Sequence, residues 1–132
     1  MILPHPSLSP SDIVRFQLTA LGDNDTPHPD RGIELVWRFA SPSNKATTGP
    51  LKRFKRMVKN PVYGLMINHQ GFKITEPTLS NGQASVDARL DVPRIGGSVV
   101  FRFILSRAAE GDFVGCWMTD SVIPLGMIRP QP

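Results

Sequence analysis

The spacing of apolar and polar residues changes at about residue 67. Before this point apolar residues recur every three or four positions, as Ile13, Phe16 and Ala20 do, which is typical of an amphipathic helix. After it they alternate with polar residues, most clearly in "QASVDARLDV", which is typical of a half-buried strand. The pattern therefore predicts an α+β chain with a helical first half and a β second half.

Three segments of helical period carry cap and break signals. They predict helices over residues 10–21, 31–40 and 50–58. The first helix begins at "SPSD", where Ser9 can cap it and Pro10 suits its first position. Asp30 is the expected cap of the second helix, which should end at "SPSN". Thr48 or Gly49 is the expected cap of the third helix.

Four segments of period two follow. They predict strands over residues 70–78, 83–92, 98–107 and 113–123. Pro77 lies near the end of the first segment, which suits an edge strand or a bulge. The linking stretches are short, so neighbouring strands should pair antiparallel as a meander. We therefore expect three N-terminal helices packed on an antiparallel sheet of four or more strands; a strongly curved sheet of this kind can form a cone with a pocket inside.

Length and composition fit one domain. The 132 residues can bury one core, and we expect the domain over residues 9–125, with tails at 1–8 and 126–132. The single cysteine, Cys116, excludes an intramolecular disulfide and a cysteine zinc site. No apolar run approaches the roughly 18 residues of a membrane span, and the first ten residues lack the features of a secretion signal. We expect a cytoplasmic protein without membrane insertion, metal or cofactor.

The most basic stretch is "ATTGPLKRFKRMVKN", in a chain of net charge +4. It lacks the glycines and the Lys-Ser/Thr pair of a phosphate-binding loop. Its cations surround an apolar stripe and form the polar arc of the third predicted helix: Lys52, Arg53, Lys55, Arg56 and Lys59. This pattern favours a solvated helix face over a nucleic-acid site. If the patch binds a partner, an anionic protein surface or membrane headgroup suits it.

Three phrases resemble a small family of uncharacterised domains associated with cyanobacteria and plastids. They are "VRFQLTAL" with the "NDTP" that follows it, "FASPSNKATTGPL" and "GCWMTDSV", and the likeness covers roughly residues 9–125. That family belongs to the SnoaL-like, nuclear-transport-factor-2-like superfamily, whose order of elements is similar to the predicted one. The resemblance implies the cone-shaped fold. The superfamily holds isomerases, cyclases, epoxide hydrolases and dehydratases as well as binding proteins, so membership alone decides no function.

The predicted strand "SVVFRFILSR" bears on self-association. Phe101 and Phe103 form its core face, whereas Val100 and Ile104 lie on the opposite face with Arg102 between them. That outer face is more apolar than exposure to water favours. Sheet-to-sheet dimers are also common in the superfamily that the chain resembles. We therefore expect a homodimer formed through the sheet.

The sequence shows no recognisable acid–base pair. Asp87, Arg89 and Asp91 resemble in type the Asp-Arg-Asp set of limonene epoxide hydrolases, but they alternate along one strand and predict an exposed charge ladder. Ketosteroid isomerases need an acidic base and a tyrosine donor inside an apolar cone. The single tyrosine, Tyr63, lies in a predicted loop, so that pattern is not met.

His69 and Asp120 are the remaining catalytic candidates. A lone histidine without an evident Asp or Ser partner, such as His69, is more typical of a satisfied interior residue than of a base. Asp120 lies two residues beyond Met118 on one strand face. It becomes a partly desolvated carboxylate if that face looks into the cone, and it is an ordinary surface acid if the face looks outward.

One pocket is expected between helices and sheet. Its predicted lining is Phe16, Gln17, Trp37, Tyr63, Met66, Trp117 and Met118. Two classes of function stay open. The first is a non-catalytic module that binds a small apolar ligand or a protein partner. The second is a small isomerase, cyclase or dehydratase acting on an apolar ring-shaped substrate, and the missing acid–base pair favours the first.

Overall fold

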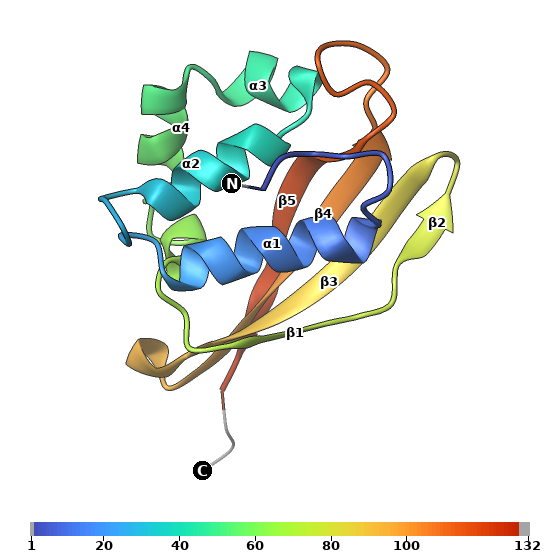
Figure 1. Cartoon of the computed structure of the whole chain (residues 1–132). Helices are drawn as coiled ribbons and strands as arrows, with labels where there is room; N and C mark the ends of the chain where they lie inside the picture. Colours follow the sequence, from blue (N-terminus) through green and yellow to red (C-terminus); the bar gives the residue numbers. More distant parts are fainter. Residues whose placement is uncertain (1, 130–132) are drawn as a thin grey trace.

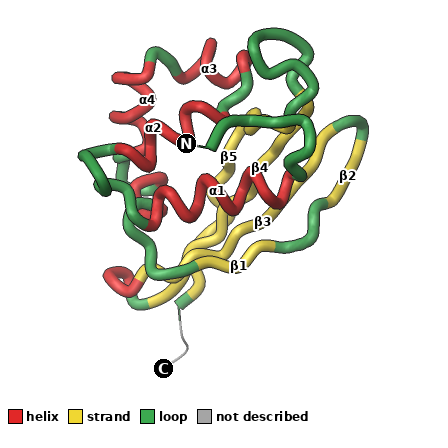
Figure 2. Tube along the Cα trace, in the orientation of Figure 1, coloured by secondary structure: helices red, strands yellow, loops and turns green. Residues whose placement is uncertain are grey.

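Four helices precede a five-stranded antiparallel sheet in the computed structural model, which describes residues 2–129 (Figure 1). The helices are α1 (Pro10–Gly22), α2 (Arg31–Phe39), α3 (Pro42–Thr48) and α4 (Leu51–Val58), followed by the 3-10 turn η1 (Tyr63–Met66). The strands are β1 (Phe72–Ile74), β2 (Thr78–Ser80), β3 (Gln83–Val92), β4 (Gly97–Arg107) and β5 (Trp117–Ile128), and the turn η2 (Pro93–Ile95) precedes β4. The helices gather on one face of the sheet (Figure 2). The predicted α+β class is confirmed.

The first two helices differ in how their N-termini are satisfied. At α1, Ser9 Oγ accepts a hydrogen bond from Asp12 N (3.1 Å) and the Asp12 carboxylate accepts one from Ser9 N (2.9 Å), a reciprocal capping box. Asp30 stands before α2 but makes no side-chain cap, because its φ of 63° departs from the extended backbone of a cap residue. Asn24 replaces it: its Oδ1 accepts a hydrogen bond of 3.0 Å from Ile33 N.

The stretch "SPSN" predicts a break, but it begins α3 instead. Ser41 Oγ accepts a backbone hydrogen bond of 3.2 Å, and Pro42 occupies the first helical position. This repeats the signal that begins α1. Thr48 is therefore the last residue of α3 rather than a cap, and α4 has no side-chain cap at all. The predicted cap at Thr48 or Gly49 is wrong.

The sheet is a meander whose first strand is divided. The strand order is β1-β3-β4-β5, and β2 also pairs with β3. Since β4 takes one edge of β3, β1 and β2 share the other edge, with Pro77 in the interruption between them. This agrees with the edge position predicted for Pro77. β5 forms the opposite edge of the sheet.

The buried face of the sheet follows the predicted alternation. On β3 every second side chain is fully buried: Ala84, Val86, Ala88, Leu90 and Val92. β4 continues this face with Val99, Phe101, Phe103 and Leu105. α1 covers it with Ile13, Val14, Leu18 and Leu21. Each large apolar side chain buried in this way stabilises the fold by about 1.5–3 kcal/mol, which holds the helices on the sheet.

The sheet is open, neither strongly curled nor closed (Figure 1), which corrects the predicted cone. β1 and β2 have three residues each, so the first edge lacks a long strand that could bend around the helices. The register shifts that bend strands lie at the other side, between β4 and β5. A pocket can therefore form between the helices and β5, but not inside a closed sheet.

β5 begins and ends later than predicted. Residues 113–116 form a turn, and the strand covers Trp117–Ile128 instead of residues 113–123. The predicted domain boundary at residue 125 falls inside this strand. Residues 130–132 of the predicted tail lie outside the described residues.

Candidate functional site

A pocket of about 340 Å³ lies between the four helices, η1 and β5. Its apolar wall comes from Leu21, Val36, Ala40, Phe54, Met57, Val58, Met66 and Val122. Its polar groups belong to Gln17, Ser43, Asn44, Thr47, Thr48, Tyr63, Thr119, Asp120 and Ser121. Asp120 is the one ionisable carboxylate in this lining, and the lining contains no lysine, arginine or histidine. Most of the surface that these residues present to the pocket is apolar, and the polar groups are mostly uncharged hydroxyls and amides.

Three of the seven predicted lining residues border this pocket, namely Gln17, Tyr63 and Met66. The other four lie elsewhere. Phe16 packs toward Phe39, with ring centroids 6.4 Å apart. Met118 joins a separate small cluster with Cys116 on the far side of β5.

The two tryptophans stand at different distances from the pocket. Trp37 lies behind Phe54, a lining residue, with ring centroids 5.1 Å apart. The Lys45 ammonium lies 5.6 Å from the centre of the Trp37 ring, and burial lowers the pKa of Lys45. Trp117 instead packs under the Arg107 guanidinium, 5.0 Å away. Trp37 is therefore a second layer behind the wall, whereas Trp117 packs against the main core outside the lining.

A bulge in β5 decides which of its side chains face the helices. Leu105 pairs with Thr119 and Ile104 pairs with Ser121, so Asp120 is an extra residue in the strand. Strict alternation along the strand would point the side chains of Met118 and Asp120 toward the helices, as the sequence suggested. With the extra residue, Thr119 takes the inward position beside Leu105 and is buried. The sequence carries no local sign of this bulge, so Thr119 was not predictable as a lining residue.

Gln17 and Thr119 form a buried polar contact at the pocket wall. Gln17 is fully buried, and its Nε2 donates to Thr119 Oγ1 (2.8 Å) and to the Ile13 carbonyl (3.2 Å). The amide orientation follows from Ile13, because the opposite orientation would place Oε1 against a carbonyl oxygen. Oε1 of Gln17 accepts no hydrogen bond from residues 2–129. An unpaired buried oxygen of this kind costs about 1–3 kcal/mol.

Thr119 also ties α3 to the sheet. Its carbonyl oxygen accepts hydrogen bonds from Ser41 N (2.9 Å) and from Asn44 Nδ2 (3.1 Å). The Oδ1 of Asn44 in turn accepts from Thr48 Oγ1 (3.1 Å). These bonds fix the polar side of the pocket and leave Gln17 Oε1 as its unpaired acceptor among the described residues.

The carboxylate of Asp120 points away from the helices. Its Oδ2 accepts a hydrogen bond of 2.6 Å from Ser106 Oγ. Ser106 follows the inward-facing Leu105 on β4 and so lies on the outer face of the sheet. Asp120 therefore borders the pocket without aiming its charged group into it. The outward alternative of the sequence analysis is the one that the geometry supports.

His69 lies outside the pocket lining and uses both ring nitrogens. Its Nε2 donates to the Leu18 carbonyl (2.7 Å), and its Nδ1 accepts from Gly71 N (3.0 Å). This requires the neutral ring with the proton on Nε2. His69 is buried and joins α1 to the segment that enters β1. No nitrogen is left for a substrate in this arrangement.

The hydroxyl of Tyr63 is likewise committed to the protein. It donates to the Val122 carbonyl at 2.9 Å, and the ring stacks on Phe101 with centroids 6.0 Å apart. The tyrosine thus closes the pocket between η1 and β5. It is not placed as a free oxyanion donor.

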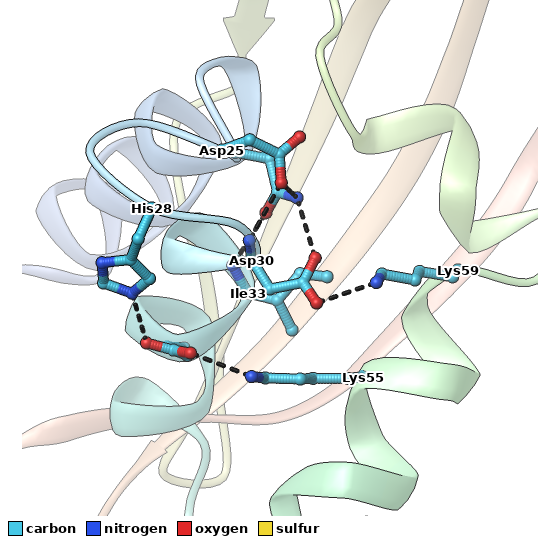
Figure 3. A network of polar contacts seen from close by, with 8 residues as sticks. Asp25, His28, Asp30, Ile33, Lys55 and Lys59 are labelled. Atoms are coloured by element: carbon cyan, nitrogen blue, oxygen red, sulfur yellow. Dashed lines mark hydrogen bonds and ion pairs between the residues drawn. The ribbon is translucent and has the colours of Figure 1, made fainter.

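The cations of α4 are partly neutralised by α2 (Figure 3). Lys55 Nζ lies 2.9 Å from a Glu34 carboxylate oxygen, and Lys59 Nζ lies 2.8 Å from one of Asp30. His28 contacts the second oxygen of Glu34 at 2.9 Å. The Lys59 ammonium holds the pKa of Asp30 below its usual value, and His28 followed by Lys55 does the same for Glu34. The pKa of Lys55 is raised by Glu34 in return.

This network positions the α4 wall of the pocket. Asp25 Oδ1 accepts from Asp30 N at 2.9 Å, so the loop between α1 and α2 holds the residue that pairs with Lys59 (Figure 3). The remaining cations of the predicted patch are exposed. Arg53 donates to the Thr47 carbonyl (3.2 Å), whereas Lys52 and Arg56 extend toward solvent.

The set of Asp87, Arg89 and Asp91 lies on the outer face of β3, opposite the fully buried side chains. Arg102 donates to both Asp87 oxygens, at 2.7 and 3.0 Å, and lowers the pKa of that carboxyl. Arg89 Nε donates to Ser98 Oγ (3.0 Å). Asp87 and Arg89 thus form cross-strand contacts, and none of the three residues lines the helix–strand pocket.

Two kinds of feature are absent between residues 2 and 129. No group of three or more His, Cys, Asp or Glu side chains there could hold a metal ion. No helix in that range is long and apolar enough to cross a membrane. No protein-family model matches the chain, and no curated protein sequence matches it.

The contact between Gln17 and Thr119 can be tested by a double-mutant cycle. Thr119→Val leaves Gln17 Nε2 with one partner fewer, and we expect a loss of about 1–3 kcal/mol in the free energy of unfolding. The double variant Gln17→Met/Thr119→Val removes both polar groups at similar shape, so its stability should equal or exceed that of the parent chain. Urea unfolding measures all four proteins. A double variant less stable than the parent chain would contradict the assignment of Oε1 as unpaired.

The Figure 3 network predicts an acid-dependent loss of stability. The pKa values of Asp30 and Glu34 lie below their usual 3.8 and 4.5, so the unfolded chain binds protons first as the pH falls. The stabilisation is therefore complete above these usual values and is lost as the pH drops through the lower folded values. Lys59→Met should flatten this decline, because the pKa of Asp30 returns toward 3.8.

The measurement is urea unfolding between about pH 6 and pH 3, the range in which carboxylates titrate. Lys52→Met is the matched control, because Lys52 lies on the same helix and contributes to no hydrogen bond or ion pair found within residues 2–129. An equal flattening in both variants would show that general charge, and not the pair with Asp30, causes the decline.

Proposed function

We propose that the chain is a non-catalytic binding module that holds a small, largely apolar molecule carrying a hydrogen-bond donor. The observation that carries this proposal is the unpaired Oε1 of the buried Gln17 at the wall of a mostly apolar pocket. Buried polar atoms in folded proteins almost always have a partner. A hydroxyl or N–H group of a ligand can supply one. Because Gln17 is fully buried, this contact needs a side-chain rotation at the pocket wall.

The shape and chemistry of the pocket support this class of ligand. A volume of about 340 Å³ lies within the range of small-molecule pockets. Apolar walls with a few polar groups orient a ligand by its polar atoms and hold it by its apolar area. The lining has no cation, and the carboxylate of Asp120 accepts a hydrogen bond from Ser106, so an uncharged ligand body suits the interior of the pocket.

The non-catalytic part of the proposal is supported by the hydrogen bonds that the candidate catalytic side chains already form within the protein. Asp120 is bound to Ser106, both nitrogens of His69 are bound to backbone groups, and the Tyr63 hydroxyl is bound to Val122. A general acid or base must instead reach the reacting group of a substrate. The alternative class, a small isomerase, cyclase or dehydratase, lacks such a group among these three.

The family proposal is membership of the SnoaL-like, nuclear-transport-factor-2-like superfamily. Helices followed by an antiparallel meander, with a pocket between the two, support it. The chain would be a member with an open sheet, in which β5 and the helices form the pocket. Since such folds serve many functions, the binding proposal stands on the site and not on this likeness.

Ligand binding can be followed through Trp37. Trp117→Phe leaves Trp37 as the single tryptophan, and it packs on the lining residue Phe54. We expect 4-methylcyclohexanol to quench or shift this fluorescence and its methyl ether, which has no donor, to bind about tenfold more weakly. Adding Gln17→Met should bring the two compounds to similar affinity. Equal affinity for both compounds before that change would contradict the role of Oε1.

Asp120→Asn separates binding from catalysis in the same assay. A binding module should retain its affinity, because the carboxylate is held by Ser106 on the outer face. If the parent chain converts the alcohol to a product, and Asp120→Asn lowers the rate of that conversion about 10²-fold or more, the protein is an enzyme and the binding-module proposal is rejected.

We also propose that two copies associate through the outer face of the sheet. Val100 and Ile104 are partly exposed there, and the exposed Ile123 of β5 pairs with Arg102 of β4 beside them. The charge of Arg102 is already paired with Asp87, which lowers the cost of covering it. An apolar stripe on a sheet face of this kind favours contact with a second copy.

Sedimentation velocity tests this association. The parent chain should have a dimer mass at high concentration, and Ile104→Glu should raise the dissociation constant at least about tenfold by placing a charge in the interface. Leu79→Glu is the control: Leu79 is 68% exposed on β2 and pairs with the inward-facing Ala84, so its side chain lies on the other face. A monomer mass at high concentration would reject the dimer.

A further inference from the structure

We infer that the ligand of the helix–strand pocket is an amphipathic anion, whose carboxylate-like head lies at Arg53 while its apolar body fills the pocket. This inference rests on the proposed binding function and adds the charge of the ligand to it. It depends on three observations: the position of Arg53 beside the pocket lining, the unequal use of the α4 cations, and hydroxyl donors in a lining whose one carboxylate accepts a hydrogen bond from Ser106.

Arg53 stands at the rim between α3 and α4. Its Nη1 donates to the carbonyl of Thr47 at 3.2 Å, and Thr47 is an exposed member of the pocket lining. Arg53 also precedes the lining residue Met57 by four positions, and residues four apart lie side by side on a helix. The hydrogen bond to Thr47 and the position one turn before Met57 place Arg53 beside the pocket lining.

The other cations of α4 and of its C-terminal cap residue, Lys59, do not lie at the pocket opening. Lys55 and Lys59 are bound to Glu34 and Asp30 of the Figure 3 network. Lys52 and Arg56 are exposed, and at about 100° per residue they lie on the side of α4 opposite the buried Phe54. They raise the positive potential near the rim without reaching it.

The rim offers hydroxyl donors to an anion, and the lining has one carboxylate, that of Asp120. Ser43, Thr47 and Ser121 are exposed lining residues with hydroxyl groups. The carboxylate of Asp120 is held by Ser106 on the far face. Arg53 uses one of its five N–H donors on Thr47, which leaves enough donors for a bidentate contact with a carboxylate.

Octanoate and 1-octanol distinguish the head group while the apolar body stays constant. In titration calorimetry at low salt we expect octanoate to bind at least about tenfold more tightly than octanol, as a charge-assisted contact allows. Arg53→Gln should abolish this preference and leave octanol affinity unchanged. Lys52→Gln, which removes the same charge one position away, should change octanoate affinity by less than about threefold. Arg53→Lys should retain part of the preference, because it keeps the charge but loses the planar fork.

Each outcome separates this inference from the function on which it rests. If 4-methylcyclohexanol and octanol bind but octanoate binds no better, the anionic head is rejected and the binding module stands. An equal loss in Arg53→Gln and Lys52→Gln also rejects it, because general charge would then explain the preference. If none of the three compounds binds, both the inference and the proposed function fail. Both substitutions are at exposed residues, and unchanged thermal unfolding verifies that the variants are folded.

Discussion

The position of Thr119 is the constraint on which the pocket depends. Its hydroxyl accepts from Gln17 of α1, and its carbonyl accepts from Ser41 and Asn44 at the start of α3. One strand residue therefore holds two helices at fixed distances from β5. This is possible because Asp120 is an extra residue in the strand, which turns Thr119 toward the helices. Without the bulge, a different set of β5 side chains would face α1 and α3.

The opposite wall, α4, is held by its buried Phe54 and Val58 and by ion pairs, without a bond to a strand like that of Thr119. Exposed ion pairs contribute little to stability one by one, typically about 0.2–1 kcal/mol. Here, however, Lys55 and Lys59 contact carboxylates that α2 and the loop before it already position. The pairs therefore specify where α4 lies more than they stabilise the fold. The same pairing leaves Arg53 as the α4 cation beside the opening, which links the placement of the wall to the chemistry of the rim.

Local signals predicted the parts of this fold that local physics decides. The capping box at Ser9 and the alternation along β3 depend on neighbouring residues, and both were visible in the sequence. The stretch "SPSN" carries the same local start signal as "SPSD", with Ser41 as cap and Pro42 at the first helical position, so the start of α3 was predictable as well. For the pocket, Gln17 and Tyr63 were predictable from periodicity and composition. Thr119 was not, because a bulge changes which residues face inward without marking the sequence.

Gln17 of α1 and His69, which contacts α1 from the segment before β1, are both buried polar side chains. Comparing them separates a structural role from a functional one. His69 is buried with both ring nitrogens bonded to backbone groups, so helix–sheet packing accounts for it completely. Gln17 is equally buried, but its Oε1 has no partner within residues 2–129. An apolar side chain of the same shape would avoid that cost. The bonds of Nε2 to Thr119 and Ile13 explain the N–H half of this amide, but no contact within residues 2–129 accounts for its oxygen. That oxygen is the group with which the proposed ligand would form its hydrogen bond.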